Sequence, residues 1–100
     1  MSRVRDAVVV GGGPAGLAFA VAAAARGLDV TVLERRQGAL DKACGEGLLP
    51  AGRRALAALG ALGLVDPAEA APLRELRWCD AGGLVAALRL PGDGGMGIRR

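Results

Sequence analysis

The sequence has no histidine and no tyrosine, and it has only one tryptophan and one phenylalanine among its 100 residues. Without histidine, it offers no imidazole general base and no histidine-containing metal site, so we predict no metal centre. Few aromatic side chains are present to stack on bases, and the basic residues are dispersed. The net charge of +3 therefore does not indicate nucleic-acid binding. Cys44 and Cys79 are far apart and do not suggest a disulfide scaffold, which favours a reduced, cytoplasmic setting.

Charge is also absent from Ala7 to Ala25, and the arginines Arg3 and Arg5 precede this run, as in a secretion signal or membrane span. The run contains three glycines and a proline at 11–14, which would break a spanning helix. We therefore expect no membrane span. The run divides into a β-branched strand at 7–10 and an Ala-rich helix from Pro14 to Arg26.

The alternating valines at 29–34 predict a second strand, which completes a strand–helix–strand unit with a right-handed crossover. The predicted fold class is therefore α/β, with a Rossmann-like βαβ unit and an antiparallel β ribbon, because a hairpin makes an antiparallel pair. The remaining predicted elements are a loop at 35–47, a helix at 50–59, a helical turn at 66–69, strands at 73–79 and 84–90 around a hairpin loop at 80–83, a Gly-rich loop at 91–97, and the start of a strand at 96–100.

The pattern Gly11-x-Gly13-x-x-Gly16 follows the first strand and opens the helix, which is the context that a dinucleotide-binding loop requires. Gly11 permits the tight turn, Gly13 lets a pyrophosphate approach the backbone, and Gly16 lets the helix pack against the strand. The helix N-terminus offers unpaired N–H groups and a partial positive charge, and Pro14 suits the first helical turn.

Glu34 ends the second strand, where an acid can accept hydrogen bonds from a ribose diol. It would repel a 2′-phosphate, although the neighbouring Arg35 and Arg36 could accommodate one. The loop, the helix and the acid together predict an ADP-binding site. FAD and NAD both contain ADP, so a non-catalytic ADP- or NAD-binding module is an alternative to an enzyme.

The stretch DAVVVGGGPAGLAFAVAAAARGLDVTVLER resembles the N-terminus of FAD-binding flavoproteins of the glutathione-reductase type. LDKACGEGLLPAGRRALAALGAL is similar to the region after the second strand in aromatic-ring flavin monooxygenases and in the related geranylgeranyl reductases. GMGIRR resembles the strand and arginine that lead those families into their next helix. The resemblance implies that residues 1–100 are the N-terminal portion of an FAD/NAD(P)-binding domain in a larger flavoprotein, with the rest of that domain and the substrate domain beyond residue 100.

The same resemblance implies roles for individual residues. Ala15 and its loop neighbours would approach the pyrophosphate, Glu34 would hold the adenosine ribose, and Arg35 would lie near the adenine. The loop residues Cys44, Gly45 and Gly47 would run beside the ribitol and flavin, and Arg100 would contact the cofactor. It also implies FAD as cofactor, NAD(P)H as electron donor, and hydroxylation of a small organic substrate by oxygen. A geranylgeranyl-reductase-like saturase is the alternative enzyme, and neither catalytic residues nor an oligomeric state is predicted.

Overall fold

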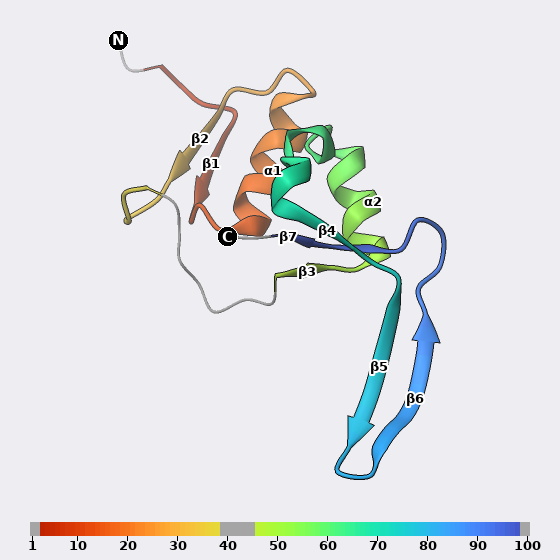
Figure 1. The fold of residues 1–100 in the computed structure, drawn as a ribbon. Coiled ribbons are helices and arrows are strands. Elements are labelled where there is room, and N and C mark those ends of the chain that lie inside the picture. The colour runs from red at the N-terminus through yellow and green to blue at the C-terminus, as the bar shows by residue number, and fades with distance from the viewer. Residues whose placement is uncertain (1–2, 39–45, 99–100) are drawn as a thin grey trace. The chain divides into compact units, whose positions relative to one another are not determined.

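The computed structural model of the protein describes residues 3–38 and 46–98 (Figure 1). These ranges form two compact units. The first unit contains β1 (Ala7–Val10), α1 (Pro14–Ala24) and β2 (Val30–Leu33). The second contains β3 (Gly47–Leu48), α2 (Pro50–Ala58), the short 3₁₀ helices η1 (Leu62–Leu64) and η2 (Pro67–Glu69), β4 (Ala70–Leu73), β5 (Glu75–Asp80), β6 (Gly83–Arg89) and β7 (Gly95–Ile98).

The first unit is the predicted βαβ unit. β1 and β2 pair in parallel, from Ala7 opposite Val30 to Val10 opposite Leu33. Helix α1 lies beside the two strands. The helix ends at Ala24, two residues before the predicted end, because the main-chain N–H groups of Arg26 and Gly27 turn back to the carbonyls of Ala23 and Ala24. Gly27 then leaves the turn with φ of 81°, in the region that favours glycine.

Helix α1 approaches β1 so closely that only glycine fits at one point of contact. A Cβ atom added to Gly16 would lie 2.2 Å from the carbonyl oxygen of Gly11 and 3.1 Å from Cγ1 of Val9. A methyl group therefore has no room between the helix and the backbone of the strand–loop junction. This geometry confirms the packing reason for the third glycine of the motif.

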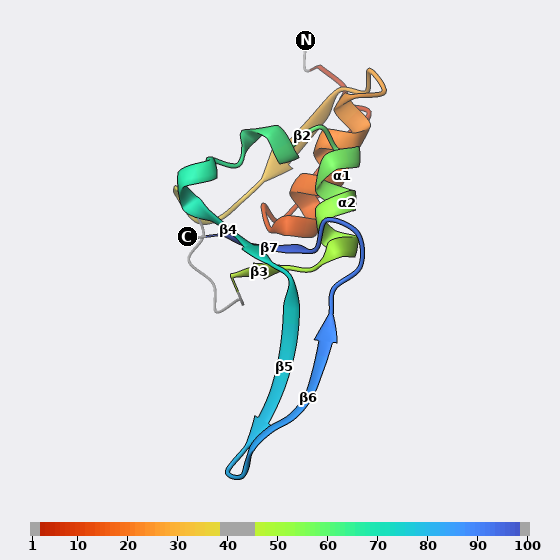
Figure 2. The same cartoon turned by 45° about the vertical axis from the view of Figure 1, so that its right-hand side comes forward.

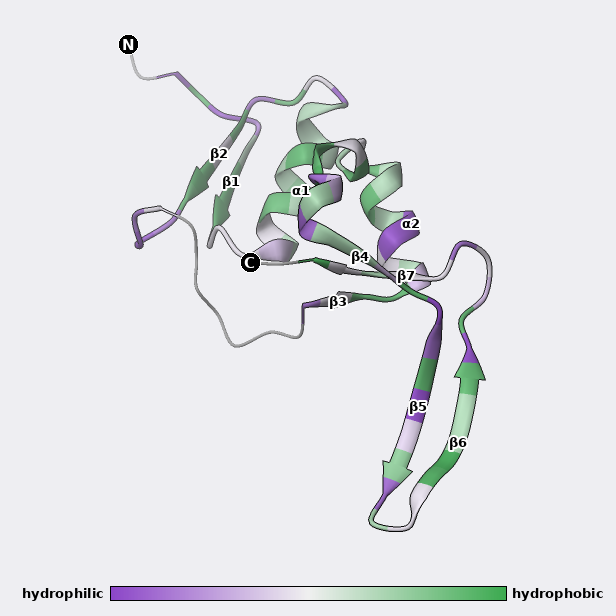
Figure 3. Cartoon of the chain, in the orientation of Figure 1, coloured by the Kyte–Doolittle hydropathy of each residue, from purple (hydrophilic) through white to green (hydrophobic). Residues whose placement is uncertain are grey.

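The opposite face of the β1–β2 pair is apolar and exposed among the described residues. Along β1 the exposure alternates: Ala7 and Val9 are half-buried beside the helix, and Val8 and Val10 are exposed. Leu33 of β2 is exposed as well. Figure 3 shows both strands as strongly hydrophobic for most of their length. Strands of parallel sheets usually read as such apolar runs because both faces are buried.

The second unit contains a three-stranded antiparallel sheet, ordered β3–β7–β4, that the sequence did not predict (Figure 2). β7 is its central strand, so the prediction of a loop continuing to residue 97 is wrong. Gly95, the first residue of β7, allows close packing of the strands. A Cβ atom on Gly95 would lie 2.6 Å from the carbonyl oxygen of Leu48, and Gly95 is buried. The positive φ angles that do mark a turn occur just before the strand, at Gly92 and Gly94.

The helical elements of the second unit follow their local sequence signals. Pro50 begins α2, and the chain leaves it through Leu59 and Gly60, whose φ is 73°. The Asp66 carboxylate accepts a hydrogen bond of 2.9 Å from the Ala68 N–H and so caps η2, which is the helical turn predicted at 66–69. None of the helices in the described ranges has the length and apolar content of a membrane-spanning segment.

The predicted antiparallel ribbon is formed by β5 and β6, which extend away from the three-stranded sheet (Figures 1 and 2). The hairpin loop is shorter than predicted, with Ala81 and Gly82 between the strands, and Leu73 belongs to β4. Alternation divides the paired residues between two faces. One face carries the apolar residues Leu76, Trp78, Ala86 and Leu88, and the other carries Glu75, Arg77, Ala87 and Arg89.

The tight contact at Gly16 gives a stability prediction. Gly16→Ala would press a methyl group onto the Gly11 carbonyl and force α1 away from β1. We expect a loss of about 1–3 kcal/mol in the free energy of unfolding, the usual range for overpacking a tight contact. Urea unfolding of the full-length protein measures this loss. Gly63→Ala is the matched control, because nothing lies within 4 Å of its added Cβ atom. Equal stability of the two variants would contradict the close contact.

Candidate functional site

The glycine loop of the first unit has the geometry of an anion-binding turn. Gly11 has φ of 107°, which lets the chain turn sharply at the end of β1. Its N–H donates a hydrogen bond of 2.8 Å to the carbonyl of Leu33. Gly13 is the extended residue before the helix, and Pro14 is the first helical residue. The first intrahelical bond joins the Leu17 N–H to the Gly13 carbonyl, at 2.9 Å.

The N–H groups of Ala15 and Gly16 therefore have no carbonyl partner within α1, as is general for the first turn of a helix. No acidic residue stands in that turn to compete for them. Together with the helix dipole, these donors make the turn electropositive and suited to a pyrophosphate. The loop, the bare first turn and the missing Cβ atoms fit the phosphate half of an ADP-containing cofactor.

Glu34 follows β2, and its carboxylate reaches back to the glycine loop. Its Oε2 accepts a hydrogen bond of 2.7 Å from the Gly12 N–H, and its Oε1 accepts one of 3.0 Å from the Arg36 N–H. These two bonds hold the pKa of Glu34 below its usual value, and the bond from Gly12 has the larger effect. The charge of Arg36 lowers the pKa as well. The side chain is exposed, and each oxygen keeps a lone pair for a ribose hydroxyl.

The predicted site residues of this unit thus form one continuous surface. Gly11, Gly13, Pro14, Ala15 and Gly16 make the loop and the first helical turn, and the Glu34 carboxylate is bonded to the loop. Arg35 is exposed, directly after Glu34.

Two further residues belong to this site and were missed in the sequence. Gly12 donates to Glu34 although it occupies a position that the glycine motif leaves open. The N–H of Arg36, which sequence reasoning considered only for its charge, donates to the same carboxylate. The signal available for Gly12 was a run of three glycines where the motif requires only its first and third.

The sequence-predicted flavin residues belong to the second unit or its borders. Gly47 was predicted in a loop, and it instead begins strand β3, opposite Gly97 of β7. The Ile98 N–H donates a hydrogen bond of 2.7 Å to the carbonyl of Glu46. Because β3 and β7 are antiparallel, the chain enters β3 and leaves β7 at the same end of the sheet. Cys44, Gly45 and Arg100 lie outside the described residues.

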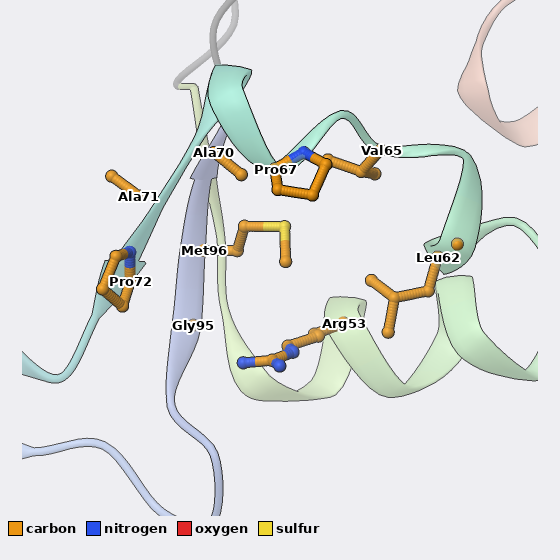
Figure 4. Close-up of a pocket in the computed structure, with 10 residues that line it drawn as sticks. Arg53, Leu62, Val65, Pro67, Ala70, Ala71, Pro72, Gly95 and Met96 are labelled. Carbon is orange, nitrogen blue, oxygen red and sulfur yellow. The ribbon is translucent and has the colours of Figure 1, made fainter.

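The second unit also contains a cavity of about 450 Å³ beside α2 (Figure 4). Arg53 is the one charged side chain in an otherwise apolar lining, and it points along the cavity beside Met96. Its guanidinium donates a hydrogen bond of 2.9 Å to the carbonyl of Asp93, which connects α2 to the turn before β7. The lining residues are Arg53, Leu62, Gly63, Val65, Pro67, Ala70, Ala71, Pro72, Gly95 and Met96. Across the described ranges, no three acidic or cysteine side chains gather as a metal site would require.

The fold and the glycine loop define a Rossmann-like dinucleotide-binding unit of the α/β class. Residues 9–39 match the family described as NAD(P)-binding Rossmann-like domain. Among curated proteins, the menaquinone reductase of Mycolicibacterium smegmatis is 52% identical over 66 residues, which are 66% of this chain and 15% of that protein. The menaquinone reductase of Mycobacterium tuberculosis is 52% identical over 59 residues, or 59% of this chain and 14% of that protein. The chain thus spans about one seventh of the length of these relatives.

Two solved structures are similar over almost the whole chain. p-Nitrophenol 4-monooxygenase from Pseudomonas putida is 25% identical with a TM-score of 0.80, and the match covers 96% of this chain and 26% of that one. 2,6-Dihydroxypyridine-3-hydroxylase from Arthrobacter nicotinovorans is 27% identical with a TM-score of 0.62, covering 97% and 24%. All these relatives are oxidoreductases by name, so the likeness of this chain is to oxidoreductases.

The lowered pKa of Glu34 gives a pH-dependent prediction. Because the folded-state pKa lies below that of an unfolded glutamate, about 4.3, the carboxylate stabilises the fold above that pH. This contribution disappears as the pH falls through the folded-state value. Glu34→Gln, which places an amide against one of the two N–H donors, should therefore lower the thermal midpoint slightly at neutral pH.

The difference between the wild type and Glu34→Gln should narrow as the pH falls below about 4.3, where glutamate in the unfolded chain takes up a proton, and it should close as the pH falls through the lower folded-state pKa. Thermal unfolding of both full-length proteins from neutral to acidic pH measures it. A difference that does not change with pH would show that the charge on Glu34 contributes nothing to the fold.

Proposed function

We propose that the chain forms part of an FAD-dependent oxidoreductase. The observation that carries the proposal is the hydrogen-bonded assembly of the glycine loop, the bare first turn of α1 and the Glu34 carboxylate, which suits the ADP half of FAD. In this proposal Gly11, Gly13, Pro14, Ala15 and Gly16 hold the pyrophosphate, Glu34 holds the adenosine ribose, and Arg35 lies beside the adenine.

The second unit supports FAD over NAD. By the resemblance seen in the sequence, Cys44, Gly45 and Gly47 border the ribitol and flavin, and Arg100 contacts the same cofactor. Those two segments are more than fifty residues apart in sequence. The pairing of Gly47 with Gly97 brings the beginning of β3 and the end of β7 together. One cofactor could therefore be contacted by both segments.

In such a protein the bound flavin supplies the redox chemistry. The residues described here would bind it, orient it and limit its contact with water. A reductase would move two electrons from NAD(P)H to an organic acceptor. A monooxygenase would move them to oxygen, which takes two more from the organic substrate and leaves as the new hydroxyl group and water. Either reaction fits a cytoplasmic location where that donor is available.

Two reactions are supported by different observations. The curated relatives at 52% identity are menaquinone reductases, which favours reduction of a menaquinone-type compound and agrees with the reductase branch of the sequence resemblance. The solved structures, at lower identity, are a monooxygenase and a hydroxylase, which support hydroxylation of an aromatic substrate with oxygen. We favour the reductase because the menaquinone reductases are 52% identical to this chain in the matched region, about twice the identity of the two solved structures.

The first experiment is purification of the full-length protein and release of its cofactor by denaturation. We expect a yellow protein that releases FAD. A colourless protein that binds NAD but not FAD would replace this proposal with a non-catalytic nucleotide-binding module. For a yellow protein, oxidation of NAD(P)H is then followed with menaquinone in the absence of oxygen, and with aromatic substrates in its presence. Turnover with menaquinone under anaerobic conditions supports the reductase, and substrate-dependent oxygen consumption supports the monooxygenase.

A pair of glycines tests whether the second unit contacts the flavin. Gly47 and Gly97 face each other in the sheet, and a Cβ atom added to either meets only ordinary contacts. The nearest atom is Leu73 Cδ1 at 3.6 Å for Gly47 and the Ala71 carbonyl oxygen at 3.7 Å for Gly97. Either alanine variant should therefore fold normally. If the cofactor passes close to Gly47, the methyl group of Gly47→Ala should cost about tenfold in FAD affinity.

The flavin-to-protein ratio after dialysis measures this effect, with Gly97→Ala as the control that should retain flavin. Undiminished flavin retention by both variants would place the cofactor away from Gly47.

A further inference from the structure

Gly12 is a glycine whose backbone does not require one. Gly11 has a positive φ that a side chain would disfavour, but Gly12 is not among the glycines with positive φ. The reason for glycine at position 12 is instead its neighbour. An added Cβ atom would lie 3.2 Å from both Cβ and Oε2 of Glu34 and 3.4 Å from Cγ. Such contacts are tighter than normal van der Waals separation, so the Glu34 side chain would have to move.

The same residue holds Glu34 through its main chain. The Gly12 N–H donates the shorter of the two hydrogen bonds to the carboxylate, at 2.7 Å. The second bond, from the Arg36 N–H, holds the other oxygen. The carboxylate is therefore held in position and orientation by main-chain donors of the protein itself, and the bonds to two N–H groups favour its charged form.

We propose that Gly12 is a positioning residue for the ribose site. Its N–H orients the Glu34 carboxylate, and its missing side chain leaves room for that carboxylate against the loop, so that the site selects an adenosine with a free 2′-hydroxyl over one with a 2′-phosphate. This inference rests on the proposed function, since it assumes that the loop binds the ADP half of a cofactor.

The selection follows from fixed charge. A carboxylate held in one orientation can accept hydrogen bonds from a ribose diol without first losing conformational freedom. The same fixed negative charge repels a 2′-phosphate at close range. A carboxylate that is free to swing away would lose both effects, and the nearby Arg36 could then attract the phosphate. The ratio of affinities for the two kinds of nucleotide is therefore the quantity that Gly12 controls.

The test uses the full-length protein and two probes that displace bound FAD: 5′-ADP, and adenosine 2′,5′-bisphosphate. The wild type should prefer 5′-ADP. Gly12→Val should weaken the binding of 5′-ADP about tenfold, which is the effect of losing one hydrogen bond between the ribose and the charged Glu34 carboxylate. It should also reduce the ratio of the affinities for the two probes. Gly12→Ala should give a smaller change in the same direction. Thermal unfolding confirms that each variant is folded, and Gly63→Val is the control, because position 63 has open space around its Cβ atom.

A double-mutant cycle shows whether Gly12 acts through Glu34. If it does, Gly12→Val combined with Glu34→Gln should bind 5′-ADP no more weakly than Glu34→Gln alone. Effects that add independently, or a probe preference that Gly12→Val leaves unchanged, would overturn the inference while leaving the ADP site intact. Failure of the wild type to bind either FAD or 5′-ADP would instead refute the proposed function, and the inference with it.

Discussion

The close approach of helix α1 to strand β1 is the constraint on which the first unit depends. With no side chain at Gly16, the first turn of the helix lies directly against the Gly11 carbonyl. That contact aims the unpaired N–H groups of the first turn at the space beyond the strand. A separate hydrogen bond, from the Gly11 N–H to the Leu33 carbonyl, places the loop beside the end of β2. The geometry of the candidate phosphate-binding turn and the packing of the helix thus both depend on the absence of a side chain at Gly16.

The Glu34 carboxylate extends this arrangement from the loop to the second strand. Parallel pairing of β1 with β2 brings the ends of both strands to one edge, so an acid that follows β2 can reach the loop that follows β1. The bond from Gly12 closes the link. The candidate phosphate loop and the candidate ribose acid are thus joined by a main-chain hydrogen bond, and a site that is already arranged in this way loses less entropy on binding.

How far the sequence predicted the structure depended on the range of the interactions. The βαβ unit and the β5–β6 ribbon were predicted correctly, because each rests on a strong local pattern and a turn between neighbouring segments. The β3–β7–β4 sheet was missed. Its strands have only two to four residues and include Gly95, Gly97 and Pro72, all poor signals for a strand. Pro72 is tolerated because β4 is an edge strand, and Gly95 has its place because the backbone of Leu48 comes close.

The sequence by itself determined the α/β class, the positions of the glycine loop and the acid, and the prediction of an ADP site, because these follow from residue type at short spacing. Only the tertiary structure showed that Gly12 and Arg36 bond to Glu34, and that Gly47 pairs with Gly97 across the second sheet. The donor in each of these contacts is a main-chain N–H group, which every residue except proline carries. A pattern of side chains therefore contains no direct signal for them, and only the folded backbone brings donor and acceptor together.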